Sequence, residues 1–132
     1  MEDLNLINST AKTPKFTITG SYIAKVVKVY DGDTFWAVFN FNGGLHRFIC
    51  RMAGYNSAEI KGGSDEEKAK AIESKDALNK LIMNKLVKLD VNGFDKYGRI
   101  LVKTSINDID VNKYMLDNNY GKSYNGAGEK KW

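Results

Sequence analysis

The sequence predicts a mainly β domain of the α+β class, with five short strands around one core. Three observations lead to this prediction. Apolar and β-branched runs separated by glycine turns fill residues 16–53, a capped amphipathic helix follows them, and two more apolar runs come after the helix. A chain of 132 residues is long enough for one such core.

The first three predicted strands form a meander over residues 16–30, 34–41 and 45–53. Asp31-Gly32-Asp33 reverses the chain after the first strand, and we expect Gly32 to supply a positive φ there. Asn42-Gly43-Gly44 is a strong hairpin signal after the second strand.

The second half of the chain adds a helix and two strands. Ser64-Asp65-Glu66-Glu67 matches a capping box, and the helix that it begins is expected to reach about residue 84. Acidic residues crowd its first turn, as the helix dipole favours. Two further strands are expected over residues 86–91 and 100–106.

A short helix and a loop complete the predicted elements. Asp110 caps a helix from Val111 to about Asn118, and residues 120–126 are expected to form a loop. Five strands with a helix after the third is the order of an OB-fold barrel, a common nucleic-acid binder. An unrelated α+β sheet stays open from the pattern alone. The predicted organisation is a flexible tail (1–15), an OB-fold domain (16–126) and a basic C-terminal tail (127–132).

Composition restricts the function classes. The net charge of +4 favours a polyanionic partner, although a lysine-rich solubilised surface would give the same value. A single cysteine, Cys50, excludes an internal disulfide and fits a reducing compartment. We find neither a secretory signal pattern nor an apolar run of membrane-spanning length, so we expect no membrane association, favour an intracellular location and expect a monomer.

Arginine is used sparingly, at three of the 20 basic positions. Alternation along the third strand places Arg47 and Arg51 on the face opposite Cys50. Arg51 and Arg99 both lie within polar motifs, Arg51-Met52-Ala53-Gly54-Tyr55-Asn56-Ser57-Ala58-Glu59 and Asp95-Lys96-Tyr97-Gly98-Arg99. The guanidinium fork grips phosphate at two points, which suits a phosphodiester. A structural ion pair is the alternative for either residue.

Three oxygen donors at strand ends predict a divalent-cation site. Asp33 offers a carboxylate, Asn56 an amide oxygen and Ser57 a backbone carbonyl, and such oxygens are the ligands of Ca²⁺. The sequence has no His or Cys cluster, so zinc is not expected. A plain turn is the alternative for the segment that holds Asp33.

The same motifs supply candidates for catalysis. Glu59 lies just beyond the predicted cation site and is placed to act as a general base or to orient a water. Arg51 and Arg99 are placed to neutralise the extra charge of a phosphorane-like transition state. Tyr97 and Tyr124 offer rings for stacking on bases. The alternatives are a solvated loop glutamate, surface ion pairs and half-buried packing of the tyrosines.

On these residues the sequence resembles the staphylococcal (micrococcal, or thermonuclease-type) nuclease family. The matching segments are Val29-Tyr30-Asp31-Gly32-Asp33-Thr34, the motif from Arg51 to Glu59, and the motif from Asp95 to Arg99, in the family's order. Val111-Asn112 at the start of a short helix also fits. The resemblance implies an OB-fold barrel with helices that uses Ca²⁺ to cleave phosphodiester bonds of DNA and RNA, single-stranded or locally open.

The resemblance also implies roles for single residues. Asp33 resembles the family's carboxylate ligand of the metal, and Ser57 resembles its backbone-carbonyl ligand. Glu59 resembles the residue that activates or positions water. Arg51 and Arg99 resemble the pair that binds phosphate and stabilises the transition state. By the same resemblance, Lys96 and Tyr97 bind a terminal phosphate and Tyr124 contacts a base.

The chain departs from the family pattern in three places. Asn56 stands where the family usually has a second metal-binding Asp, and losing one negative charge is expected to weaken Ca²⁺ binding. Ala58 replaces a usual proline, and this replacement is expected to loosen the loop that holds Glu59. The sequence ends soon after Tyr124, where the best-known members continue into a long helix.

These observations give one main hypothesis and two alternatives. The main hypothesis is a Ca²⁺-dependent endonuclease that does not distinguish DNA from RNA. The first alternative is an OB-fold module that has lost catalysis and binds nucleic acid or a protein partner, and Asn56 is the residue that favours it. The second is a structural protein with a basic surface, which requires the three motifs to be coincidence.

Overall fold

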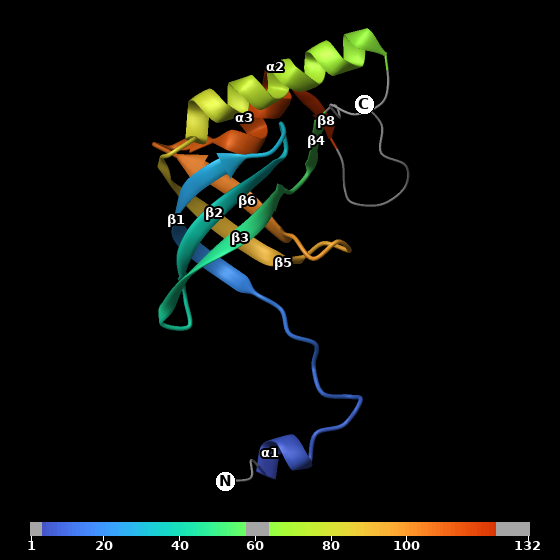
Figure 1. Ribbon diagram of the computed structural model, residues 1–132, viewed down its shortest axis with the longest axis vertical. Coiled ribbons are helices and arrows are strands. Elements are labelled where there is room, and N and C mark those ends of the chain that lie inside the picture. The colour runs from blue at the N-terminus through green and yellow to red at the C-terminus, as the bar shows by residue number, and fades with distance from the viewer. Residues whose placement is uncertain (1–3, 58–63, 124–132) are drawn as a thin grey trace.

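Five strands close into a barrel in the computed structural model, which describes residues 4–57 and 64–123. Neighbouring strands pair antiparallel in the order β3-β2-β1-β5-β6, and a parallel pairing of β3 with β6 closes the barrel (Figure 1). The closure confirms the predicted OB-fold barrel and excludes an open sheet. The barrel strands are β1 (Thr19–Val29), β2 (Thr34–Phe41), β3 (Gly44–Met52), β5 (Leu86–Phe94) and β6 (Ile100–Ile106).

Within the described ranges, three helices and three short strands accompany the barrel. In Figure 1 α2 lies across one end of the barrel with α3 beneath it, and α1 lies well away from the barrel on an extended segment. The short strand β7 continues the sheet beside β6, and β4 pairs with β8 as a separate two-stranded sheet. The bounds are α1 (Leu4–Ile7), β4 (Tyr55–Ser57), α2 (Asp65–Ile82), β7 (Ile109–Asp110), α3 (Val111–Asp117) and β8 (Gly121–Ser123).

Both predicted helix starts are confirmed. Ser64 Oγ accepts a hydrogen bond of 3.2 Å from the Glu67 backbone N–H, and the Asp110 side chain accepts one of 3.1 Å from the Lys113 N–H. α2 ends at Ile82, two residues before the expected end, because the next residues leave the helical conformation. Asn84 has a φ of 60°, a left-handed turn that sends the chain into β5.

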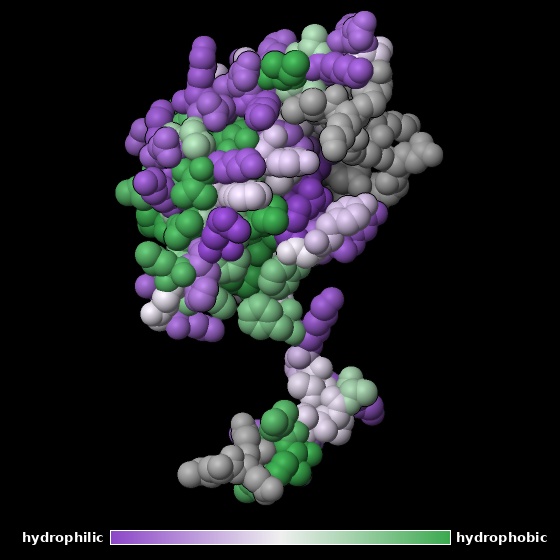
Figure 2. Space-filling view, in the orientation of Figure 1, coloured by the Kyte–Doolittle hydropathy of each residue, from purple (hydrophilic) through white to green (hydrophobic). Residues whose placement is uncertain are grey.

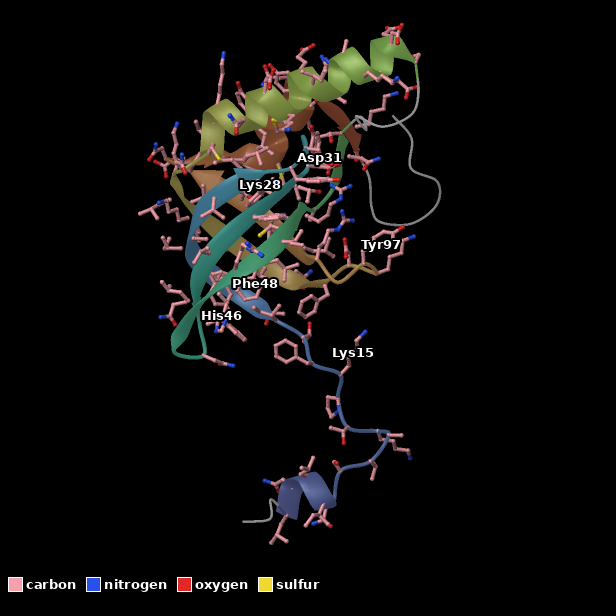
Figure 3. All side chains as sticks on the ribbon, in the orientation of Figure 1. Lys15, Lys28, Asp31, His46, Phe48 and Tyr97 are labelled. Atoms are coloured by element: carbon pink, nitrogen blue, oxygen red, sulfur yellow. The ribbon has the colours of Figure 1, made fainter. Side chains whose placement is uncertain are left out.

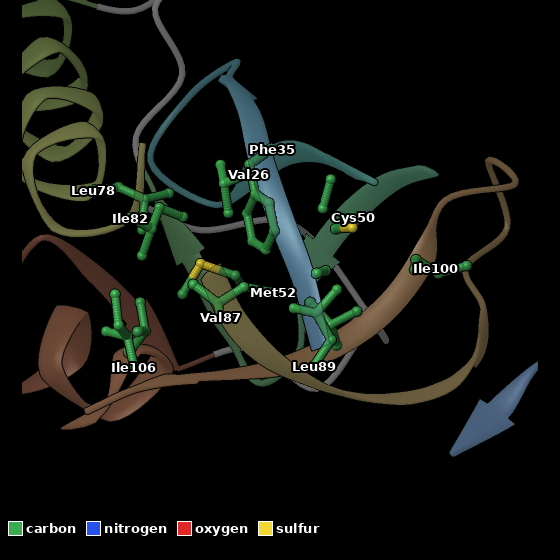
Figure 4. Close-up of a cluster of buried hydrophobic side chains, with 14 of the residues drawn as sticks. Val26, Phe35, Cys50, Met52, Leu78, Ile82, Val87, Leu89, Ile100 and Ile106 are labelled. Atoms are coloured by element: carbon green, nitrogen blue, oxygen red, sulfur yellow. The ribbon is translucent and has the colours of Figure 1, made fainter. Parts of the chain in front are cut away.

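The core fills the barrel and continues under α2. Inward-facing residues alternate along the strands: Phe35, Ala37 and Phe39 of β2 are buried. Leu78 and Ile82 of α2 are fully buried and pack onto one open end of the barrel (Figure 4). The apolar face of α2 and the open end of the barrel therefore bury each other. This packing fixes α2 next to the β1–β2 turn and β4.

Glycine acts in two different ways at the turns. Asn42 and Gly43 have φ values of 53° and 83°, as a tight hairpin requires, so the predicted β2–β3 hairpin is confirmed. The prediction for Gly32 was wrong, because Gly32 is not among the described glycines with positive φ. A Cβ on Gly32 would lie 2.6 Å from Ser74 Cβ and 2.8 Å from Ser57 Cβ. Gly32 is needed because α2 and β4 approach the turn closely.

The chain ends differ from the predictions in two details. The predicted tail contains one helical turn, α1, with no buried residue. The predicted loop at 120–126 begins with a strand, β8, and residues 124–126 lie outside the described range. Among the described residues, every helix is too short or too polar to cross a membrane.

Candidate active site

Asp33 is the buried centre of the site. Its side chain is almost fully enclosed between the β1–β2 turn and β4, at 2% exposure. Oδ2 accepts a hydrogen bond of 2.9 Å from the Ser57 backbone N–H, and Oδ1 accepts one of 2.9 Å from Thr34 Oγ1. The Asp33 backbone carbonyl accepts from the Met52 N–H. The carboxylate is therefore held rigidly where the ends of β1, β3 and β4 meet.

Arg51 spans the same junction from β3. Its Nη1 lies 3.3 Å from Asp33 Oδ2 and donates to the carbonyl oxygens of Met52 (3.1 Å) and Tyr55 (2.8 Å). Its Nη2 donates to Asn56 Oδ1 at 2.6 Å. Arg51 is only 7% exposed, so this guanidinium organises the chain between β3 and β4 as well as balancing the Asp33 charge.

Asn56 and Ser57 each keep one buried polar atom that has no hydrogen-bond partner among the residues that the structure describes. These atoms are Asn56 Nδ2 and Ser57 Oγ, and both residues are at most 1% exposed. An unpartnered buried polar group costs free energy and is uncommon in folded proteins. The structure thus brings Asp33, Arg51, Asn56 and Ser57 together, as predicted. Within the described part of the chain, two buried polar atoms of this group form no hydrogen bond.

A contact between β4, β8 and α2 supports this grouping. The Tyr120 carbonyl accepts hydrogen bonds from Tyr55 Oη (3.0 Å) and from Ser74 Oγ. Burial, and to a smaller extent the Asp33 charge, raises the pKa of the Tyr55 phenol, so Tyr55 stays a neutral donor. Gly121 packs so closely on Tyr55 and Asn56 that a Cβ there would lie 2.7 Å from Tyr55 Cζ. β8 therefore sets the position of β4.

Arg99 belongs to a second cluster, in the β5–β6 turn. Its Nε donates to Asp95 Oδ2 at 2.7 Å, and Asp95 Oδ1 accepts from the backbone N–H groups of Tyr97 and Arg99. The Arg99 guanidinium and Lys96 Nζ each lie 5.2 Å from the centre of the Tyr97 ring. Tyr97 is 71% exposed at the tip of this turn (Figure 3). The turn therefore presents two cations and an aromatic ring to solvent.

Two of the predicted site residues, Glu59 and Tyr124, lie outside the described residues. Ser74, Gly121 and Asn112 support the site from elements distant in the chain; the sequence analysis overlooked the first two and named Asn112 only as part of the Val111-Asn112 match, with no role in the site. Of these three, only Asn112 has a sequence signal, a polar residue at the start of an apolar helical face.

Cys50 is no nucleophile at neutral pH, because burial raises the pKa of its thiol to about 12.

Asn112 fixes the chain where β3 leads into β4. Its Nδ2 donates to the carbonyl oxygens of Ala53 (2.8 Å) and Val102 (3.2 Å), and its Oδ1 accepts from the Thr104 N–H at 3.1 Å. Asn112 is 7% exposed, so water cannot readily replace these bonds. The side chain thereby ties α3 and β6 to the segment that follows Arg51.

We expect Asn112→Ala to lower the free energy of unfolding by about 3 kcal/mol, because it leaves buried donors and acceptors without partners. Urea unfolding followed by circular dichroism measures the change. Asn118→Ala is the matched control, since the Asn118 side chain donates to Tyr114 O at an exposed position. Equal losses in the two variants would contradict the role assigned to Asn112.

The comparison with protein families matches most of this arrangement. A model of the family described as "Staphylococcal nuclease homologue" matches residues 50–131, more than half of the chain. The matched segment runs from β3 through β8 and includes Arg51, Asn56 and Arg99, whereas Asp33 precedes it. A search of curated proteins found no match. The matched family and the closed five-stranded barrel agree, and the chain belongs to the staphylococcal nuclease homologue family.

Proposed function

We propose that this protein is a Ca²⁺-dependent endonuclease that hydrolyses phosphodiester bonds of DNA and RNA. The observation that carries the proposal is the buried Asp33–Arg51 pair at the junction of β1, β3 and β4. A carboxylate and a guanidinium in one small site suit a cation and a phosphate side by side. Membership of the nuclease family supports the same chemistry.

The donor set of the site fits a hard cation. Asp33 supplies carboxylate oxygens, and Asn56 and Ser57 supply an amide and a backbone carbonyl; all of these are ligand types that Ca²⁺ accepts. The unpartnered Asn56 Nδ2 is consistent with a side chain whose hydrogen bonding changes when a ligand enters. Among the described residues, no group of three or more His, Cys, Asp or Glu side chains is arranged to hold a metal ion, so the protein charge that they offer to a cation at this site is low. A bound Ca²⁺ would supply positive charge beside the scissile phosphate.

The protein's own residues account for the remaining requirements of hydrolysis. Glu59 takes a proton from the water that attacks phosphorus, the bond from phosphorus to the leaving oxygen breaks, and that oxygen takes up a proton from solvent water to leave as a hydroxyl group. Arg51 and Arg99 stabilise the additional negative charge on the phosphoryl oxygens as that bond breaks. Lys96 and Tyr97, exposed on the β5–β6 turn, bind a terminal phosphate, and Tyr124 contacts a base.

Glu59→Gln tests this proposal. We expect the variant to cleave single-stranded DNA and plasmid DNA about 10²- to 10⁴-fold more slowly than the wild type, because glutamine cannot accept the proton. Cleavage is measured with Ca²⁺, and with a chelator as the metal-free reference. Glu66→Gln, which neutralises an exposed carboxylate in the first turn of α2, is the matched control and should cleave at the wild-type rate. Equal rates for Glu59→Gln and wild type would reject Glu59, and inactivity in every divalent metal tried would reject the enzyme.

The second candidate is a binding module without catalysis. The observation in its favour is that Arg51 already has Asn56, Asp33 and two backbone carbonyls as partners, and that Asn56 is neutral. Such a site can be stable without a metal. Salt-dependent binding of nucleic acid with no cleavage in Ca²⁺, Mg²⁺ or Mn²⁺ would establish this function instead.

A further inference from the structure

Arg51 already contacts both of the side chains that the sequence predicts as cation ligands. Its Nη1 lies 3.3 Å from Asp33 Oδ2, and its Nη2 donates to Asn56 Oδ1 at 2.6 Å. Figure 2 shows hydrophilic side chains spread over the face in view, where water satisfies them. Asp33, Arg51 and Asn56 are instead buried, so they depend on protein partners. The guanidinium therefore bridges two oxygens in the way that a bound cation would.

A divalent cation on these two oxygens is incompatible with the present position of Arg51 Nη2. Two oxygens that bind one Ca²⁺ lie at most about 5 Å apart, so the ion sits directly between them. Asn56 Oδ1 has two lone pairs, but a cation and Nη2 on the same oxygen would bring like charges close together in a buried site. A cation that ligates both Asp33 and Asn56 must therefore displace Nη2.

The two terminal nitrogens of Arg51 are held to different degrees. Nη1 donates to the carbonyl oxygens of Met52 (3.1 Å) and Tyr55 (2.8 Å). These bonds use both of its hydrogens, so its contact with Asp33 is an ion pair without a further hydrogen bond. Within the described ranges, Nη2 has Asn56 Oδ1 as its one hydrogen-bond acceptor. A cation can therefore free Nη2 while Nη1 keeps the guanidinium anchored to the backbone.

The orphaned amide nitrogen of Asn56 is a second observation on the same contact. Asn56 Nδ2 is buried and has no hydrogen-bond partner in the described part of the chain. An aspartate here would offer an oxygen in its place, and could contact Arg51 with one oxygen and a cation with the other. The amide has a single oxygen, so it serves either Arg51 or the cation.

We propose that a divalent cation and Arg51 Nη2 compete for the side-chain oxygen of Asn56, so that binding of the cation releases Nη2 to a phosphate. Without the cation, Asn56 holds Nη2 away from any ligand. When the cation binds, Nη1 stays on the backbone carbonyls and Nη2 donates to a phosphate oxygen. Asn56 is thus a positioning residue, which makes the hydrogen bond from Arg51 to phosphate depend on prior binding of the cation.

The identity of the ion as Ca²⁺ and of the phosphate as substrate rests on the proposed function, whereas the competition at Asn56 does not. The competition is a property of binding. It is measured on the whole protein with the metal alone, without any cleavage.

The first test follows the Arg51 guanidinium by NMR in protein with ¹⁵N-labelled arginine. The chain has only three arginines, so the signals are few, and Arg51→Lys assigns those of Arg51. We expect Ca²⁺ to shift the Nη2 signal of Arg51 toward that of the exposed Arg47, because Nη2 loses its acceptor, and to leave Nη1 nearly unchanged. Saturation with Ca²⁺, followed by calorimetry, that leaves the Nη2 signal in place would overturn the proposal.

The second test compares Ca²⁺ affinities by calorimetry. Lysine has a single terminal nitrogen, so it cannot contact the Met52 and Tyr55 carbonyls and Asn56 Oδ1 all at once. Arg51→Lys should therefore bind Ca²⁺ about tenfold more tightly than the wild type, the equivalent of one hydrogen bond to a charged group. Arg47→Lys makes the same exchange at an exposed position of β3 and should bind as the wild type does. Equal or weaker binding by Arg51→Lys would contradict the competition.

Asn56→Asp tests the role of the amide in a variant that keeps Arg51. A carboxylate serves Arg51 and the cation together, so we expect tighter Ca²⁺ binding and an Nη2 signal that no longer shifts on binding. A shift as large as in the wild type would show that asparagine is not the cause of the competition.

Comparison with cleavage distinguishes this proposal from the nuclease itself. Release of Nη2 by Ca²⁺ in a protein that cuts no nucleic acid would leave the competition standing and reject the nuclease. Cleavage in Ca²⁺ while Nη2 keeps its contact with Asn56 would do the reverse. If neither the wild type nor Arg51→Lys binds Ca²⁺, the competition is rejected.

Discussion

Arg51→Ala is expected to lower the free energy of unfolding by about 3–5 kcal/mol, the usual cost of removing one partner of a buried ion pair. The loss is large because the Asp33 carboxylate stays behind at 2% exposure without the Arg51 guanidinium beside it. The carbonyl oxygens of Met52 and Tyr55 also lose their donor, as does Asn56 Oδ1. We expect phosphodiester cleavage to fall with stability, because the same change loosens β4.

The measurement is urea unfolding of Arg51→Ala beside Arg47→Ala. Both residues are arginines of β3, but Arg47 is exposed and contacts the Trp36 ring. Arg47→Ala should cost no more than about 1 kcal/mol. In a double-mutant cycle with Asp33→Asn, Arg51→Ala should cost about 2 kcal/mol less than it does in the wild type. If the losses in free energy of unfolding of Arg51→Ala and Asp33→Asn simply add in the double variant, Asp33 and Arg51 are not coupled.

Gly121→Ala is expected to separate β8 from β4 and to destabilise the protein by about 3 kcal/mol or more. The new methyl group would lie 2.7 Å from Tyr55 Cζ, and closer still to Tyr55 Cε2 and to the Asn56 carbonyl oxygen. The Tyr55 ring is fully buried and the carbonyl belongs to the backbone, so neither can turn away. Because Asn56 and Ser57 lie on β4, cleavage should be lost at temperatures at which the barrel is still folded.

Gly44→Ala is the control for Gly121→Ala. Gly44 also lies in a strand, its φ is not in the left-handed range, and the nearest atom to an added Cβ is His46 Nε2 at 3.5 Å, an ordinary contact. Hydrogen exchange at the β4 amides should accelerate in Gly121→Ala alone. Replacing Tyr55 with Leu in the Gly121→Ala background should not restore cleavage, because the clash with the Asn56 carbonyl remains. Wild-type stability and activity in Gly121→Ala would contradict the packing described for β8.

The strands of the barrel, its hairpin turn and the two capped helices were predictable because their signals are local. Alternation of inward residues, the Asn42-Gly43 turn and the caps at Ser64 and Asp110 each act over a few residues, and each produced the expected element. β8 gave no such signal, because three residues with one exposed lysine carry neither periodicity nor a buried apolar pair. β8 forms by pairing with β4, which lies far away in the sequence.

The candidate site, too, was predictable from the sequence only in part. The residue types at Asp33, Arg51, Asn56 and Ser57 pointed to a cation and a phosphate, and strand order predicted that these residues converge. The sequence could not show that Arg51 binds Asn56 and two backbone carbonyls, since such contacts depend on the path of the chain between β3 and β4. The position of Glu59 relative to Asp33 stays a prediction.

By itself, the sequence determined the strands, the two capped helices and the chemical character of the site, because periodicity, turn residues and donor types are properties of short segments. Only the tertiary structure decided why Gly32 and Gly121 must be glycine and why Ser74 and Asn112 matter. It alone showed that Arg51 contacts both Asp33 and Asn56. The physical reason is that close approach and hydrogen bonding between distant segments depend on packing, which no local pattern encodes.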